Sequence, residues 1–423
     1  MNKQSKKGLV PELRFPEFRD AGEWKFKPLK KLAKRCTEKN RDGKVVRVLT
    51  NSAEHGIVDQ RDYFDKDIAI QGNLKNYSIV EKGDFVYNPR ISAIAPVGPI
   101  SRNNIATGVM SPLYTVFRFK IENNSFYSYF FKTSGWHQYM RQVSSTGARH
   151  DRMAISKDDF LFMPLPCSPE EAEQQKITDC LSSLDELIAA HTEKLKALQS
   201  YKKGLMQNLF PVEGKTVPAL RFPEFRDADE WQIIKLDKLG ELVSGLTYSP
   251  KDVRGKGLLV LRSSNVQNGI VSLEDNVYVR PDIKGANLSR PNDILVCVRN
   301  GSKPLIGKNA LIPEGLPLCT HGAFMTVFRA KNPRFVFQLF QTNTYTRQVA
   351  ADLGATINSI NGNQFKKYEF CIPTSEEEKQ KVAGCLSSID DVIAAQAQKV
   401  EELKIHKKGL MQRLFPIMDE VGV

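Results

Sequence analysis

The chain carries one phrase twice, at an interval close to half its length. VPELRFPEFRDAGEW begins at Val10, VPALRFPEFRDADEW begins at Val217, and 13 of the 15 positions are identical. Self-similarity at a fixed interval is the signature of a repeated structural module. The 423-residue chain is therefore predicted to consist of two units joined head to tail, at about 10–216 and 217–423.

Two more phrases recur, both with an offset of 205 residues. CLSSLDELIAA at Cys180 returns as CLSSIDDVIAA at Cys385, and KKGLMQNLFP at Lys202 returns as KKGLMQRLFP at Lys407. The stretches between the repeated phrases have diverged almost beyond recognition. This pattern indicates two units that perform the same task but differ in its details.

The last third of each unit is predicted to be one long helix. Its apolar residues alternate at steps of four and three, the a/d pattern of a coiled coil, for more than four heptads. At ~1.5 Å per residue each seam is roughly 50 Å long. The seam positions are Ile177, Leu181, Leu184, Ile188, His191, Leu195, Leu198, Lys202, Leu205 and Leu209 in the first unit, and Val382, Leu386, Ile389, Ile393, Gln396, Val400, Leu403, Lys407, Leu410 and Leu414 in the second.

Each apolar stripe needs cover, and the most economical cover is the other helix. Parallel packing would place the two middle domains at the same end, whereas antiparallel packing would relate them by an approximate twofold axis. A DNA duplex has local twofold axes, and half-sites on one face repeat every ~34 Å. The antiparallel arrangement is expected here, although heptads alone fit a plain dimerisation coil equally well. His191 in the seam is interpreted as a packing residue rather than a metal ligand.

The middle portions, about 25–165 and 232–372, have the pattern of mixed α/β domains. Residues 113–120 and 324–330 are rich in β-branched and aromatic side chains, which is typical of strands, and Gly, Asn and Pro separate such runs. The expected fold class is α+β: two mixed α/β domains joined by two long helices that form an antiparallel coiled coil, with a pseudo-twofold internal repeat.

The charge balance points to a polyanionic partner. Lys and Arg number 61 against 48 Asp and Glu, a formal net charge of +13, which favours nucleic acid but also suits a merely soluble basic protein. Seven cysteines without a C-x-x-C pair predict neither a disulfide framework nor a zinc knuckle. No apolar run is long enough to span a bilayer and no signal-peptide core opens the chain, so a cytoplasmic protein without a membrane partner is expected.

Catalytic signatures are missing from the sequence. GSKPLIGKN from Gly301 has one residue too many between its glycines for a phosphate loop, and Asn309 replaces the Ser or Thr that would hold magnesium. Neither a zinc-hydrolase histidine pattern nor a G-x-S-x-G elbow occurs. The chain is predicted to be a non-catalytic protein that recognises its partner, and no metal site is expected.

Two divergent domains that alternate with two near-identical helices resemble the specificity (S) subunit of type I restriction–modification systems. The likeness is carried by PEEAEQQKI and SEEEKQKV at the helix starts, LSSLDELIAA and LSSIDDVIAA in their middles, and KKGLMQNLFP and KKGLMQRLFP at their ends. It implies target recognition domains at 1–166 and 212–372, spacer helices at 167–211 and 373–416, and a tail at 417–423.

The resemblance also implies partners. Each domain would read one half of a bipartite, asymmetric site in double-stranded DNA, and the helices would set the unread spacer. Two methyltransferase (M) subunits would dock on the chain and methylate adenine with S-adenosylmethionine, and restriction (R) subunits would add ATP- and Mg-dependent translocation and cleavage. No cofactor would reside in this chain. The repeated aromatics, which would serve as packing anchors for each domain, are Phe15, Phe18, Trp24, Phe222, Phe225 and Trp231.

Loops suited to reading DNA follow the candidate strands at matching places in both domains. Arg or Lys suits guanine, Asn or Gln suits adenine, and small hydroxyls suit phosphates. Each residue has a plainer interpretation as a solvated loop or turn residue. The candidates are Thr50, Asn51, Ser52, Arg90, Ser92, Thr146, Arg149, His150 and Arg152 in the first domain, and Arg262, Ser263, Ser264, Asn265, Arg299, Asn300, Ser302, Lys303, Asn358, Ser359, Asn361 and Asn363 in the second.

Two other functions remain open from the sequence. One is a non-catalytic coiled-coil scaffold that binds another protein, with an incidental basic surface. The other is a stand-alone nuclease or methyltransferase, against which the missing catalytic motifs argue.

Overall fold

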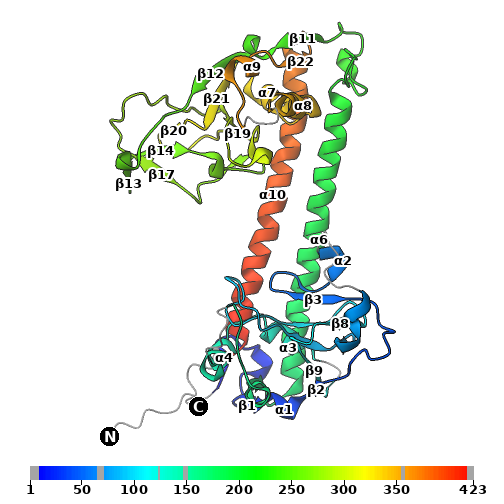
Figure 1. Ribbon diagram of the computed structural model, residues 1–423. Helices are drawn as coiled ribbons and strands as arrows, with labels where there is room; N and C mark the ends of the chain where they lie inside the picture. The colour runs from blue at the N-terminus through cyan, green and yellow to red at the C-terminus, as the bar shows by residue number, and fades with distance from the viewer. Residues whose placement is uncertain (1–8, 64–70, 122–123, 146–150, 354–357, 417–423) are drawn as a thin grey trace. The chain divides into compact units, whose positions relative to one another are not determined.

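The computed structural model of the chain divides into two compact units (Figure 1). Unit 1 contains Met1–His191 together with Lys399–Val423, and unit 2 contains Thr192–Gln398. Each long helix therefore contributes one segment to each unit. The structure describes residues 9–63, 71–121, 124–145, 151–353 and 358–416, so the expected tail at 417–423 lies outside the described residues.

Unit 1 is built around a four-stranded antiparallel sheet in the order β2-β9-β6-β7. These strands are β2 (Ala33–Cys36), β9 (Thr115–Phe119), β6 (Phe85–Tyr87) and β7 (Ile100–Arg102). The paired strands β1 (Lys25–Pro28) and β10 (Pro164–Cys167), β3 (Leu49–Ser52) and β4 (Gly56–Asp59), and β5 (Ser78–Val80) and β8 (Gly108–Met110) surround the sheet. The helices are α1 (Leu29–Leu32), α2 (Gln60–Tyr63), α3 (Ser125–Phe130), α4 (His137–Val143), α5 (Lys157–Phe162) and the long α6 (Glu171–Leu209).

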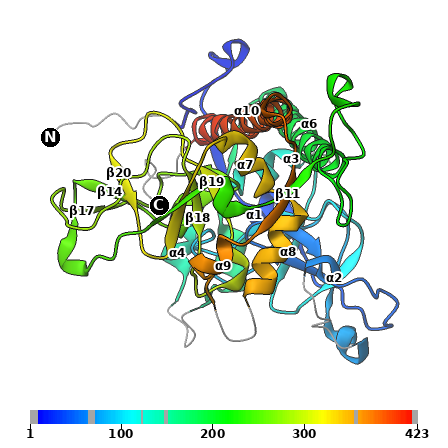
Figure 2. The same ribbon diagram turned by 90° about the horizontal axis from the view of Figure 1, so that it is seen from above.

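Unit 2 has a corresponding antiparallel sheet in the order β12-β21-β18-β19. These strands are β12 (Gly240–Ser244), β21 (Met325–Ala330), β18 (Ile294–Cys297) and β19 (Asn309–Leu311). A second sheet contains β13 (Val253–Arg254), β17 (Val277–Val279), β14 (Leu258–Leu261) and β20 (Cys319–His321), and β14, β17 and β20 lie together in both views (Figures 1 and 2). The remaining elements are β11 (Gln232–Lys235), β15 (Val266–Gln267), β16 (Ile270–Val271), β22 (Glu369–Ile372), α7 (Pro333–Leu339), α8 (Asn343–Asp352), α9 (Gly362–Phe365) and the long α10 (Glu376–Leu414).

The two sheets repeat one another in detail although their sequences have diverged. In unit 1, Arg118 on β9 donates to Asp84 just before β6, with an Nε–Oδ1 distance of 2.6 Å. In unit 2, Arg329 on β21 makes the same contact with Asp293 before β18, at 3.0 Å. Both aspartates are buried. Because a buried carboxylate is costly without a partner, each pair fixes the start of one central strand against its neighbour.

Each divergent domain is closed by a two-stranded ribbon at its ends. Strand β1 pairs antiparallel with β10, so that Lys25 faces Cys167, and β11 pairs with β22, so that Gln232 faces Ile372. The chain thus enters and leaves each domain at one place. Residues 25–167 and 232–372 are cassettes set between the repeated opening phrase and the long helix.

A buried carboxylate ties each opening phrase to the first turns of its long helix. Arg14 donates to both oxygens of Glu173, at 2.6 and 2.9 Å, and Trp24 Nε1 adds a third hydrogen bond of 3.0 Å. Glu173 and Trp24 are buried. Bidentate Arg–carboxylate pairing fixes orientation as well as distance, so this cluster sets the angle at which the phrase meets α6.

Unit 2 contains the same cluster. Arg221 donates to both oxygens of Glu378 at 2.8 Å, and Trp231 Nε1 donates at 3.1 Å. Both tryptophans expected as packing anchors are therefore buried, and each also forms a hydrogen bond that the sequence pattern did not predict. Phe18 is buried too, whereas Phe225 is half-buried.

The long helices are 39 residues each. All twenty seam positions, ten per helix, are buried or half-buried, including Lys202 and Lys407. In unit 1 Lys407 forms an ion pair with Asp185, and Ile177 shares a core with Leu414. In unit 2 Lys202 Nζ lies 2.6 Å from Asp390 Oδ1. Within each unit, therefore, the two helix segments run in opposite directions.

Candidate nucleic-acid interface

In unit 1 the described candidate residues converge on one hollow of about 440 Å³. They come from three separate stretches: β3, the loop after β6, and the short segment before α5. The residues predicted from sequence that line it are Thr50, Asn51, Ser52, Arg90, Ser92 and Arg152.

Strand pairing explains why these stretches meet. Strands β6 and β9 are antiparallel, with Tyr87 opposite Thr115, so the loop after β6 and the turn before β9 lie at the same sheet edge. Beyond that edge Arg90 forms an isolated antiparallel bridge with Arg152. Arg90 is exposed, and its guanidinium lies 3.5 Å from Asp151 Oδ2. Two basic side chains are thus presented at the rim of the hollow.

Asn51 corrects the prediction made for it. Its side chain is 2% exposed, and its Nδ2 donates to the carbonyl oxygens of Val86 at 2.8 Å and Pro99 at 3.2 Å. A buried amide committed to backbone carbonyls cannot reach a base edge. Asn51 instead fixes strand β3 against the loops of the hollow, and Thr50 and Ser52 on either side of it remain half-buried.

In unit 2 the corresponding loops are also brought together. Arg299 forms an isolated bridge with Ser359, as Arg90 does with Arg152, and Asn300 Nδ2 donates to Ser263 Oγ at 3.0 Å. Arg262 is half-buried and pairs with Asp275 at 2.7 Å. Ser264 is half-buried, whereas five polar candidates are exposed: Ser302, Lys303, Asn358, Asn361 and Asn363.

Asn265 is a second correction. It is 0% exposed, its Oδ1 accepts from the Arg262 amide at 2.8 Å, and its Nδ2 donates to the Ser272 carbonyl at 2.9 Å. Asn361 likewise has a local task, since its side chain accepts from Asn363 N as the N-cap of α9. Asparagine side chains commonly close turns in this way. The buried Asn265 side chain therefore shapes the loop that carries Arg262 and is not presented to a partner.

Thr146, Arg149 and His150 lie outside the described residues. The residues that flank them are placed: Ser145 forms an isolated bridge with Ala154. Whether this loop reaches DNA stays a prediction.

The sequence interpretation missed residues in the turn before β9. Residues 113–120 were expected to form a strand, but β9 begins at Thr115, which leaves Leu113 and Tyr114 in the turn. Both line the hollow, and Tyr114 Oη lies 3.2 Å from Thr50 Oγ1. Pro112 directly before them is a turn signal that could have shortened the predicted strand.

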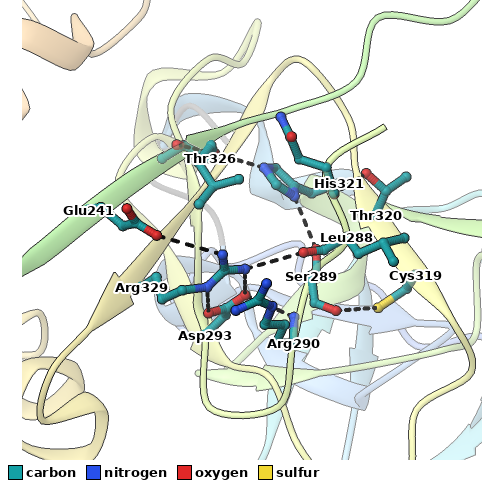
Figure 3. A network of polar contacts seen from close by, with 12 residues as sticks. Glu241, Leu288, Ser289, Arg290, Asp293, Cys319, Thr320, His321, Thr326 and Arg329 are labelled. Carbon is teal, nitrogen blue, oxygen red and sulfur yellow. Dashed lines mark hydrogen bonds and ion pairs between the residues drawn. The ribbon is translucent and has the colours of Figure 1, made fainter. Parts of the chain in front are cut away.

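A polar network in unit 2 joins residues around Asp293 and His321 (Figure 3). Asp293 holds Arg329, and the hydrogen bonds between them raise the pKa of the guanidinium. His321 is fully buried: its Nε2 lies 2.9 Å from the Val243 carbonyl and its Nδ1 lies 3.0 Å from Ser289 Oγ. Since a carbonyl only accepts, Nε2 carries the proton and Ser289 donates to Nδ1. Burial lowers the pKa of His321, which keeps the ring neutral.

Among the described residues, no group of three or more His, Cys, Asp or Glu side chains could hold a metal ion. In the same part of the chain, no helix is long and apolar enough to cross a membrane. Burial raises the pKa of the thiol of Cys319 to about 11, which is opposite to the shift a nucleophilic cysteine requires.

Residues 228–404 match the family model of the type I restriction modification DNA specificity domain. The StySPI type I restriction enzyme specificity subunit of Salmonella potsdam is 26% identical over 194 residues, 43% of this chain and 42% of that protein. The MjaVIII specificity subunit of Methanocaldococcus jannaschii is 25% identical over 285 residues, 65% of each protein. The chain thus spans about two fifths of the length of the first relative.

Solved structures extend the likeness over almost the whole chain. The type I restriction–modification S subunit from M. genitalium is 13% identical, with a TM-score of 0.59 over 97% of this chain and 100% of that one. A chain from a structure on complex assembly of a type I R-M system gives 14% identity and a TM-score of 0.54 over 94% and 98%. The fold is therefore that of a type I S subunit. The matched domain and the curated relatives agree with this fold, so the chain is similar to type I restriction–modification specificity subunits in both sequence and fold.

Proposed function

We propose that this chain is the DNA sequence-specificity subunit of a type I restriction–modification complex, in which each recognition domain reads one half of a bipartite, asymmetric site. One observation carries the proposal: two sheets of the same strand order present different polar loops at the same edge. Equal scaffolds with unequal loops suit two half-sites of different sequence. Arg90 and Arg299 occupy equivalent exposed positions on these edges, and arginine is the commonest reader of guanine.

The long helices and opening phrases have a different task in this proposal. Their sequences are nearly identical in the two units, so they suit two identical methyltransferase subunits, which would bring S-adenosylmethionine. Restriction subunits would bring ATP and Mg. The opposed helix segments within each unit and the covered seam positions support an antiparallel coiled coil that separates the half-sites. The chain itself is not an enzyme, in keeping with its relatives, which are specificity subunits.

Methylome sequencing of the host, with and without this gene, tests the proposal. It is expected to reveal one split motif that depends on the gene. Arg299→Ala should relax the motif at one base pair of a single half, and Arg90→Ala at one base pair of the other. An arginine–guanine pair contributes about 1–3 kcal/mol of discrimination, or roughly 5- to 150-fold.

Matched controls lie at the opposite ends of the same strands. Arg290 precedes β18 and Lys82 precedes β6, and both are exposed. Arg290→Ala and Lys82→Ala should leave the motif unchanged. If Arg90→Ala or Arg299→Ala degrades both halves equally, or neither, these edges do not read bases.

Salt dependence separates this function from a scaffold that binds only protein. Phosphate contacts release counterions, so DNA affinity of the assembled complex should fall steeply between about 50 and 200 mM salt. A protein-only scaffold would show no DNA affinity at any salt concentration.

A further inference from the structure

Each recognition domain exposes one large apolar side chain at the same place. Leu113 and Phe324 are both 57% exposed, and each stands five residues before the arginine that pairs with the buried aspartate, Arg118 or Arg329. Both therefore lie at the sheet edge that carries the candidate reading loops. A side chain that is apolar at matched positions of two diverged domains, and is not buried in either, indicates a ligand contact rather than a core position.

In unit 2 this side chain lies beside an arginine. The guanidinium carbon of Arg299 is 5.8 Å from the centroid of the Phe324 ring. The amides of Val298 and Arg299 both donate to the Phe324 carbonyl, at 3.0 and 3.1 Å. The backbone thus holds the phenyl ring and the guanidinium as one unit, and cation–π attraction orients the two side chains.

In unit 1 the same combination is built from different residues. Leu113 lines the hollow whose rim carries Arg90 and Arg152. Leucine has no ring and cannot stack on a base, so the property common to the two positions is apolarity and not aromatic character. The bound group must therefore be apolar and must lie next to a group that arginine can read.

We propose that Leu113 and Phe324 each contact the 5-methyl group of a thymine, next to the base read by the neighbouring arginine, in the half-site of its own domain. This inference rests on the proposed function and adds two specificity residues to it. The thymine methyl is the apolar group that unmodified DNA presents in the major groove. The acceptors of guanine, which arginine reads, face the same groove. A thymine next to a guanine in the major groove thus accounts for an apolar and a basic side chain that lie next to each other.

A protein partner fits these residues less well. A subunit that docks identically on both units would meet residues that repeat, as those of the opening phrases and long helices do. Leu113 and Phe324 differ, as do the loops around them. Half-sites of different sequence explain both the common apolarity and the change of side chain.

Uracil substitution tests the contact, because uracil lacks only the methyl group. Once the split motif is known, duplexes with deoxyuridine in place of each thymine, on either strand, are bound to the assembled complex of the chain with its methyltransferase subunits. Loss of one buried methyl group raises the dissociation constant about fourfold. One uracil in each half-site should produce this loss with the native chain.

The substitutions Phe324→Ala and Leu113→Ala complete the cycle. Phe324→Ala should weaken binding to the thymine duplex by about fourfold or more and should abolish the effect of the uracil in its own half-site only. Leu113→Ala should do the same in the other half. Thermal melting of each variant should match that of the native chain, since both side chains are exposed.

Control variants come from exposed apolar residues elsewhere in the same domains. Leu318, 67% exposed, precedes β20, and Ile105 follows β7 at the edge opposite Arg90. Leu318→Ala and Ile105→Ala should preserve both affinity and the response to uracil.

The outcomes separate this inference from the function on which it rests. If the native complex binds its motif but no uracil weakens it, or if Phe324→Ala and Leu113→Ala lose affinity equally for thymine and uracil duplexes, the methyl contact is wrong while half-site reading stands. If the native complex shows no sequence-specific binding, the proposed function itself is wrong.

Discussion

Glu173 and Glu378 explain at the level of single residues why one phrase occurs twice in this chain. Each carboxylate is buried at the start of a long helix and accepts hydrogen bonds from an arginine and a tryptophan that the phrase supplies. The contact reaches 157–159 residues along the chain. A phrase that must satisfy a buried charge tolerates little change, whereas the cassette between the two partners is free to diverge.

The substitution Glu378→Gln tests this tie. It removes the charge that Arg221 faces, and the hydrogen bonds to Glu378 are what raise the pKa of that guanidinium. Breaking a buried pair costs about 3–5 kcal/mol, which urea unfolding of unit 2 should show. Glu224→Gln is the control, because Glu224 makes an ion pair with Lys381 on the surface. Equal stability of the two variants would mean that the cluster does not fix the phrase.

His321 gives unit 2 a pH dependence. Burial lowers its pKa below the ordinary value of 6.5, so the unfolded chain binds the proton more readily than the folded one. The stabilisation is therefore present above about pH 6.5 and is lost as pH falls through the lower, folded pKa. The groups around the ring are Ser289, Val243 O, Asp293 and Arg329. The hydrogen bond to Val243 O and the charge of Asp293 partly oppose the effect of burial on the pKa, and Arg329 adds to it.

Thermal unfolding between pH 8 and pH 5 measures this effect. The melting temperature of unit 2 should decline below pH 6.5 in the native chain, and His321→Gln, which keeps one donor and one acceptor, should flatten the decline. His406→Gln, on the exposed face of α10, should leave it unchanged. A decline of the same size in His321→Gln would assign it to other groups.

At the scale of elements, the long helices were the most predictable part of the molecule and the sheets the least. Heptad spacing survives in the sequence because each seam residue must be covered, and all twenty predicted positions are buried or half-buried. The strands, by contrast, are two to six residues long. Runs that short do not determine which strands pair, and the contacts Asp84–Arg118 and Asp293–Arg329, which join neighbouring strands of each sheet, connect residues far apart in sequence.

The same contrast applies to the candidate site, where the position of some residues could be predicted from sequence and that of others could not. Residue type and position singled out Arg90, Arg152 and Arg299, which lie in loops at one edge of each sheet, and their contact with DNA stays a prediction. The same criteria could not separate Asn51 and Asn265 from them, because asparagine suits both a base contact and a turn. Only the tertiary contacts of the two amides show that they are buried.

The two seam lysines provide a prediction for the helices. Lys202 pairs with Asp390 in unit 2 and Lys407 with Asp185 in unit 1, and each pair joins the two helices. Asp390→Lys should destabilise unit 2, and the exchange Lys202→Asp with Asp390→Lys should recover most of the loss. A coupling of about 1 kcal/mol is expected for a partly exposed pair, from urea unfolding of the four variants. Additive effects would show that the ion pair does not stabilise the helix pair.

At the scale of the whole molecule, the cassette arrangement predicts that the recognition domains can be exchanged. Each cassette begins and ends on one antiparallel ribbon, and the buried Arg–Glu clusters that join the opening phrases to the long helices lie outside it. Replacing 232–372 by a second copy of 25–167 should therefore leave the ribbon and both Arg–Glu clusters intact. Such a chain should direct methylation to a motif whose two halves are the same sequence in inverted orientation.

Methylome sequencing of a host that carries the exchanged chain measures the outcome. The control is a chain with the two cassettes in reversed order, which should give the native motif read from the opposite strand. The inverted orientation follows from the twofold relation proposed for the two units. A motif with two direct copies of one half would therefore contradict the antiparallel arrangement while leaving domain-wise reading intact. A motif that still has two different halves would show instead that residues outside the cassettes determine the recognised bases. The proposal that the cassettes read DNA while the helices separate the half-sites would then be wrong.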